Sequence, residues 1–158
     1  FSEKEIKSAS KHFINYYKKN ISTYSKLFPG IIDCLDWLKN ESAKITICTN
    51  KYEKLAKQLT RDLEIDSYFS VITGSDTFKY RKPDPLHLKK TIKLAKGKLN
   101  NSIMVGDSIT DFQTAKNAGI PIIIVGWGYS DIPAKTIGGD SFIEEGKELA
   151  KTIKSILI

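Results

Sequence analysis

The chain has 158 residues, 41% of them hydrophobic and 27% charged, which is typical of one globular domain with a buried core. This composition excludes collagen-like, disordered and disulfide-scaffold proteins. The longest apolar run, residues 120–125, contains a proline and is too short to span a membrane. The net charge of +7 favours anionic partners such as phosphate esters, nucleic acid or a membrane surface.

The N-terminal segment is predicted to form an amphipathic helix over residues 3–19, because apolar side chains recur on one helical face between lysines. A second short helix is expected after Pro29 and Gly30 and ends near Asn40. A boundary is therefore expected between the two helices, and it divides the chain into residues 1–22 and 23–158.

From residue 44 onward, apolar strands alternate with helices. Strands are predicted at 45–48, 69–73, 102–105 and 121–125, and helices at 52–63, 85–96, 109–118 and 149–157. Neighbouring parallel strands need a crossover, usually a helix, and strands that are apolar throughout are covered on both faces. The predicted fold class is therefore α/β, a doubly wound, Rossmann-like parallel sheet with helices on both faces.

The two cysteines, Cys34 and Cys48, fall in apolar segments and lack the spacing of a zinc site or a redox pair. We expect both to be buried structural thiols. So few cysteines, without a recognisable signal peptide, are typical of a reducing compartment, and the sequence predicts a cytoplasmic location.

Ligands of an open parallel sheet bind at the carboxyl ends of its strands, so the residues that follow each strand are candidates for a site. These positions are polar after three of the predicted strands. They carry Thr49 and Asn50, then Lys82 in the segment RKPDP, then Asp107 and Asp111. One edge of the sheet is therefore expected to gather a hydroxyl, an ammonium and two carboxylates.

The two carboxylates, Asp107 and Asp111, would repel each other at close range unless a cation lay between them. Oxygen ligands favour a hard ion, so the pair predicts a Mg²⁺ site. The alternative is that Asp107 caps the following helix and Asp111 is a favourable charge near its N-terminus.

The segment around Lys82 contains two prolines, which restrict the backbone and end at the start of a helix. A lysine held there can neutralise a phosphoryl group and the carboxylate that attacks it, whereas the alternative is a surface lysine. Thr49 and Asn50, with free helix N-terminal amides, can bind a phosphate, or they only close a strand and cap a helix.

Together, Thr49 after an apolar strand, Lys82 in RKPDP, and Asp107 with Asp111 in GDSITD resemble motifs two, three and four of the haloacid dehalogenase-like superfamily of phosphohydrolases. The stretches TGSDTFKYRKPDP and VGWGYSD are most similar to its phosphoglycolate phosphatase branch. The resemblance makes residues 1–22 the last part of a helical cap and residues 23–158 the core.

The resemblance implies a Mg²⁺-dependent phosphatase that acts on a small phosphorylated metabolite through an aspartyl-phosphate intermediate. Lys82 and Thr49 match catalytic positions of the family, and together with Asn50 they also match its substrate-binding segments. Asp107 and Asp111 match its metal ligands. The nucleophile and the acid–base aspartate belong to a first motif, DxDGT after an apolar strand, which these residues do not contain. We expect the intact protein to supply that strand, which in this family lies between the strands ending at Thr49 and Gly106. The 158 residues alone are expected to be inactive.

Several alternatives remain open. A catalytically inactive phosphate-binding or regulatory domain is one, although a receiver-like domain places its acids before its threonine and lysine. A nucleic-acid-binding domain would explain the eight basic residues between Lys79 and Lys98, but no nucleic-acid motif is present, so neither nucleic acid nor a membrane is predicted as a partner. A sugar phosphomutase, a nucleotidase, a pyrophosphatase or a dehalogenase could share the same core, and the sequence does not specify an oligomeric state.

Overall fold

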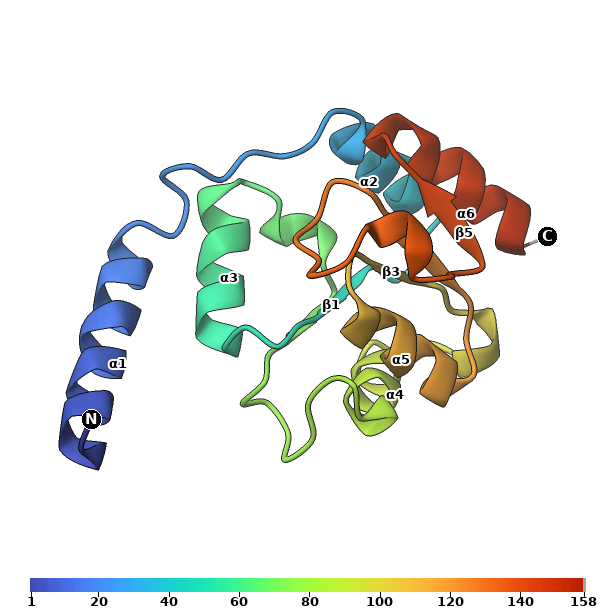
Figure 1. The fold of residues 1–158 in the computed structure, drawn as a ribbon. Coiled ribbons are helices and arrows are strands. Elements are labelled where there is room, and N and C mark those ends of the chain that lie inside the picture. Colours follow the sequence, from blue (N-terminus) through green and yellow to red (C-terminus); the bar gives the residue numbers. More distant parts are fainter. Residues whose placement is uncertain (158) are drawn as a thin grey trace.

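The computed structural model describes residues 1–157 and contains five parallel strands among them. The strands form two separate sheets (Figure 1). In the first sheet, β1 (Thr46–Cys48) pairs with β2 (Val71–Thr73). In the second, β4 (Ile122–Val125) lies between β3 (Met104–Gly106) and β5 (Ser141–Ile143).

Six α-helices alternate with these strands over the described part of the chain. They are α1 (Glu3–Lys19), α2 (Ile31–Asn40), α3 (Glu53–Asp62), α4 (Pro85–Leu94), α5 (Ile109–Ala118) and α6 (Leu149–Leu157). Each had been predicted to within a few residues, and so had the first four strands, so the α/β fold class is confirmed. The sequence analysis missed β5, because three residues in a glycine-rich stretch are too short to show a period.

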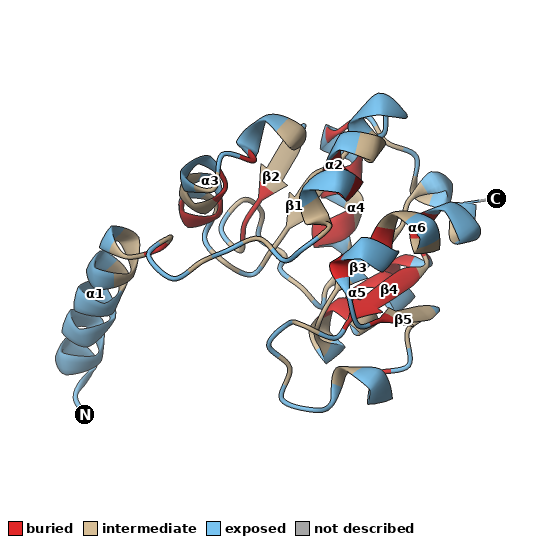
Figure 2. Cartoon of the chain, turned by 90° about the horizontal axis from the view of Figure 1, so that it is seen from above, coloured by how far each residue is buried: buried red, intermediate tan, exposed pale blue. Residues whose placement is uncertain are grey.

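Helices cover both faces of the second sheet (Figure 2). Successive side chains of a strand point to opposite faces, and β4 is buried along its whole length. Ile122 and Ile124 pack with side chains of α4 and α5, whereas Ile123 and Val125 pack with side chains of α2 and α6. The second sheet therefore has a hydrophobic core on each face.

The two sheets are separated by a cavity of about 940 Å³. Its walls come from α2, α4 and α6 and from the β1 and β3 edges, which pair with no strand other than β2 and β4 within residues 1–157. The lining is mainly apolar and includes Leu38, Ile92, Val105 and Ile153. The cavity thus lies between β1 and β3, where the sequence analysis placed the first-motif strand.

The helix α1 lies apart from the core beside α3 (Figure 1), and none of its residues is buried. Contacts with Gln58 and Lys51 connect its C-terminal end to the core. The Gln58 amide donates a hydrogen bond of 2.9 Å to the Lys18 carbonyl, and the Lys51 ammonium lies over the Tyr17 ring. The division between residues 1–22 and 23–158 stays a prediction, and residue 158 is outside the described residues.

The free thiols differ in burial, because Cys34 is buried and Cys48 is only partly so. None of the described helices is long and apolar enough to cross a membrane.

Candidate functional site

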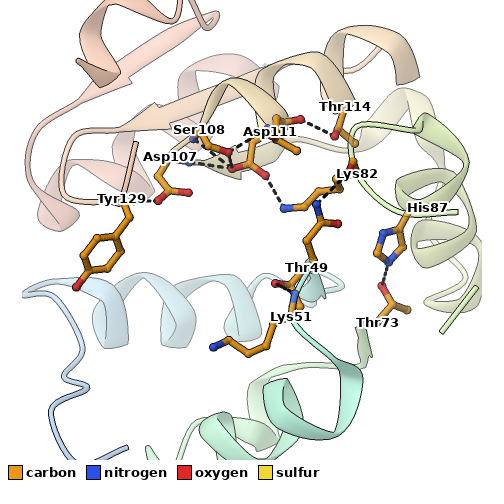
Figure 3. A network of polar contacts seen from close by, with 12 residues as sticks. Thr49, Lys51, Thr73, Lys82, His87, Asp107, Ser108, Asp111, Thr114 and Tyr129 are labelled. Atoms are coloured by element: carbon orange, nitrogen blue, oxygen red, sulfur yellow. Dashed lines mark hydrogen bonds and ion pairs between the residues drawn. The ribbon is translucent and has the colours of Figure 1, made fainter. Parts of the chain in front are cut away.

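The predicted site residues lie together at the carboxyl ends of β1 and β3 (Figure 3). Thr49 directly follows β1, and Asp107 directly follows β3. Lys82 reaches the same place from the loop before α4, and Asp111 from the first turn of α5. Both sheets therefore contribute to one group of polar side chains.

A buried ion pair joins the two sides of this group. The Lys82 ammonium lies 2.6 Å from Asp111 Oδ1, and the two side chains are only 12% and 6% exposed. The second oxygen of Asp111 accepts hydrogen bonds from the Asp107 and Ser108 N–H groups and from the Ser108 hydroxyl. Burial alone would raise the pKa of Asp111, but Lys82 and these hydrogen bonds together lower it by more, so its pKa lies below the ordinary value. Asp111 is therefore a carboxylate at neutral pH.

The start of α5 explains why Asp111 lies there. Ser108 is the N-cap and forms a capping box with Asp111, the third helical residue, so the alternative that Asp107 caps this helix is wrong. The end of β3 also lies so close to Asp111 that residue 106 must be glycine, because a Cβ there would lie 2.4 Å from the Asp111 Cβ.

Asp107 is held by a loop that follows β4. The Tyr129 N–H donates a 2.7 Å hydrogen bond to Asp107 Oδ2. Gly128 permits this approach, since a Cβ at that position would lie 2.0 Å from the Asp107 Cβ. The other carboxylate oxygen, Oδ1, has no hydrogen bond within residues 1–157. Sequence reasoning missed the role of Tyr129, although VGWGYSD is one of the stretches that resemble the phosphoglycolate phosphatase branch.

Two side chains fix the segment that carries Lys82. The Asn50 amide donates a 2.9 Å hydrogen bond to the Lys82 carbonyl, so this amide holds the lysine loop. Asp84 caps α4 by accepting a hydrogen bond from the Leu86 N–H. The hydroxyl of Thr49 accepts a 3.1 Å hydrogen bond from the Lys51 N–H and lies beside the Lys82 loop in Figure 3.

A buried polar cluster lies beneath the lysine loop, and the sequence analysis did not identify it. The His87 imidazole is fully buried and lies 3.2 Å from the Thr73 hydroxyl, which is 2.7 Å from the Thr91 hydroxyl. Burial and then the charge of Lys82 lower the pKa of His87, so the ring is neutral at pH 7. A histidine two residues after Pro85 was the only signal available in the sequence.

The comparison with known families decides what this arrangement belongs to. Residues 1–125 match the family model for haloacid dehalogenase-like hydrolases. The chain belongs to the haloacid dehalogenase-like hydrolase family. This confirms the resemblance inferred from Thr49, Lys82, Asp107 and Asp111.

Curated relatives place this hydrolase near the phosphoglycolate phosphatases. It is 39% identical over 156 residues to the phosphoglycolate phosphatase of Agrobacterium fabrum, covering 99% of this chain and 67% of that protein. It is 45% identical over 121 residues to the phosphoglycolate phosphatase of Mesorhizobium japonicum, covering 77% of this chain and 53% of that one. The chain therefore spans about half to two thirds of the length of these relatives.

Solved structures of haloacid dehalogenase-like proteins share the fold. The crystal structure of a predicted phosphoglycolate phosphatase from Haemophilus somnus matches with a TM-score of 0.91 and 25% identity, over 96% of this chain and 68% of that one. The β-phosphoglucomutase of Clostridium difficile matches with a TM-score of 0.82 and 22% identity, over 99% and 69% of the two chains. At that identity, the second match shows the fold alone.

The donor set of this hydrolase fits a hard divalent cation at one position. Asp107 offers the free oxygen Oδ1, and oxygen donors suit Mg²⁺. Both oxygens of Asp111 already accept hydrogen bonds from Lys82 and the α5 N-terminus. Within the described chain, no three His, Cys, Asp or Glu side chains cluster as a complete metal site.

Proposed function

We propose that the intact protein is a magnesium-dependent phosphatase that hydrolyses a small phosphate monoester of the phosphoglycolate type through an aspartyl-phosphate intermediate. The observation that carries this proposal is the buried Lys82–Asp111 pair beside Thr49 and Asp107 at the strand ends. The phosphoglycolate phosphatases among its relatives support the reaction and the substrate type.

In this proposal, Lys82 and Thr49 bind the phosphoryl group. The Lys82 ammonium neutralises charge on the phosphoryl oxygens, and the Thr49 hydroxyl donates a hydrogen bond to one of them. Asp111 keeps the ammonium in place, and Asn50 fixes the backbone of the same loop. Positioning and charge neutralisation of this kind provide most of the catalysis in phosphoryl transfer.

Asp107 is the residue that would hold Mg²⁺ directly, through Oδ1. When bound, the ion supplies positive charge for the phosphoryl oxygens and for the attacking carboxylate. The Tyr129 N–H fixes the other oxygen of Asp107 and so orients the carboxylate. Asp111 would add negative charge near this position, but both of its oxygens accept hydrogen bonds from Lys82 and the α5 N-terminus, so its role as a metal ligand stays a prediction.

We place the nucleophile and the acid–base aspartate on a strand of the intact protein that occupies the cavity between β1 and β3. The apolar lining of this cavity, about 940 Å³ in volume, suits a buried strand. A parallel strand there would end at the same edge as Thr49 and Asp107, so its aspartates would face Lys82.

The two free thiols, Cys34 and Cys48, support a reducing compartment such as the cytoplasm for this reaction.

The test is phosphate release by the intact protein from 2-phosphoglycolate and p-nitrophenyl phosphate, with and without Mg²⁺. Asp107→Asn removes the charge of the proposed ligand, and we expect at least a hundredfold lower magnesium-dependent turnover with an unchanged unfolding midpoint. The control Asp131→Asn alters an exposed aspartate of the same loop region and should retain activity. Full activity of Asp107→Asn would refute the metal role, and phosphate binding without release would indicate an inactive phosphate-binding domain.

A further inference from the structure

We propose that Lys51 and Tyr17 form a second anion subsite, which binds the carboxylate of a substrate whose phosphate lies at Thr49 and Lys82. This inference rests on the proposed function and identifies the residues that select its substrate class. It is carried by the position, the environment and the charge of the Lys51 side chain.

The position of Lys51 is fixed by its backbone. Its N–H donates a 3.1 Å hydrogen bond to the Thr49 hydroxyl oxygen, and its carbonyl accepts a 3.0 Å hydrogen bond from the Ser75 N–H. The residue is thus held directly beside the hydroxyl assigned to the phosphoryl group. In Figure 3 its side chain extends away from the Lys82–Asp111 pair, so the two ammonium groups of the site are directed to different places.

The environment of the Lys51 ammonium is aromatic. The nitrogen lies 4.5 Å from the centre of the Tyr17 ring and hydrogen bonds with the Tyr17 hydroxyl. Lys51 and Tyr17 are both partly buried. Lys79 and Lys90 also lie over aromatic rings, but they are exposed. A cation over a ring keeps its charge, and the ring limits the directions that the side chain can adopt.

The charge of Lys51 remains available to a ligand. The described residues contain three ion pairs, and none of them involves Lys51. Lys82, by contrast, is paired with Asp111. The phosphate of a bound substrate would therefore contact Lys82, which is already paired with Asp111. A carboxylate on the same substrate would contact Lys51, which forms no ion pair with a described residue. The Tyr17 hydroxyl can add a hydrogen bond to that carboxylate.

The subsite combines two parts of the chain, because Lys51 follows β1 and Tyr17 belongs to α1. Small phosphate esters that carry a carboxylate close to the phosphate would contact both parts at once. Esters of neutral alcohols would contact only the phosphoryl site. We therefore expect discrimination between these two classes to depend on Lys51.

The experiment compares 2-phosphoglycolate with ethyl phosphate, which has the same two-carbon length and no carboxylate. Lys51→Met keeps the length of the side chain and removes its charge, and Lys54→Met is the matched control on the exposed side of α3. Kinetics of the intact protein should show KM for 2-phosphoglycolate raised about tenfold or more by Lys51→Met, because a hydrogen bond to a charged group is lost. The KM of ethyl phosphate should change far less, and Lys51→Arg should restore part of the preference.

Calorimetric titration of both esters in the absence of Mg²⁺ supplies a readout in which the proposed magnesium-dependent hydrolysis does not consume the ligand. Wild type should bind 2-phosphoglycolate at least tenfold more tightly than ethyl phosphate, and Lys51→Met should bind the two about equally. A preference that survives in Lys51→Met, or an equal loss for both esters, would overturn the subsite. If wild type binds with this preference but releases phosphate from neither ester, the proposed function fails and the subsite stands.

Discussion

Replacing Lys82 with methionine would leave the carboxylate of Asp111 buried without its cation. Removing one member of a buried ion pair usually costs about 3–5 kcal/mol of unfolding free energy, because the remaining charge is desolvated and uncompensated. Asp111 would keep three hydrogen bonds from Asp107 and Ser108, which stabilise its charged form. We therefore expect Lys82→Met to lower the free energy of unfolding by about 2–4 kcal/mol at neutral pH.

The loss should depend on pH in a defined direction. In the wild type, folding lowers the pKa of Asp111. Its charged form therefore stabilises the folded state at any pH above the ordinary carboxyl pKa. This stabilisation is lost as the pH falls through the pKa that Asp111 has in the folded protein. Without Lys82, only the hydrogen bonds oppose the effect of burial, so the pKa of Asp111 should be higher than in the wild type. The penalty of Lys82→Met should then be largest at neutral pH and become smaller as the pH falls and the carboxyl group of the variant takes up its proton.

Urea denaturation followed by circular dichroism measures both effects. Lys93→Met, an exposed lysine on the same helix, serves as the control and should change stability by less than about 0.5 kcal/mol. The double variant Lys82→Met/Asp111→Asn should recover a large part of the loss, because it removes the buried charge. A single-variant loss below about 0.5 kcal/mol, or no recovery in the double variant, would refute the argument.

Three further outcomes follow from the structure. Gly128→Ala would place a Cβ 2.0 Å from the Asp107 Cβ, so the loop must move and magnesium-dependent turnover should fall at least tenfold; turnover equal to wild type would contradict this geometry. Ile124→Ala should lower the free energy of unfolding by about 2–5 kcal/mol, measured in urea, because Ile124 is fully buried. The lowered pKa of His87 means that the unfolded state binds its proton first as the pH falls, so stability should decline below about pH 6.5. That decline should be shallower in His87→Gln, and an identical slope in both proteins would count against a neutral buried imidazole.

Most of the fold was accessible from the sequence because its elements carry strong periodic signals. Helix α5, for example, is capped by Ser108 at its N-terminus and by Gly119, whose backbone is left-handed, at its C-terminus, and both are recognisable boundary residues. The short strand β5 has no such signal, and only its pairing with β4 defines it.

The site was predictable to the extent that its chemistry lies in side chains that follow strands. Lys82 and Asp111 could be placed on one edge, but not paired with each other, since 29 residues separate them along the chain. The contribution of Tyr129 is made by a backbone N–H, which every residue except proline carries, so its identity gave no signal. His87 was missed because, without coordinates, the sequence does not show that a histidine on an amphipathic helix is buried beside polar side chains.

The strands of this chain give the site two supports. Asp107 and Asp111 stand on the half that contains β4 and both hydrophobic cores, whereas Thr49 and Lys51 stand on the half that contains β1 and β2. The Lys82–Asp111 ion pair links the two halves, and the proposed strand between β1 and β3 would join them further in the intact protein. An anion that binds both halves would couple their fluctuations, so that the ligand itself contributes to the rigidity of the site.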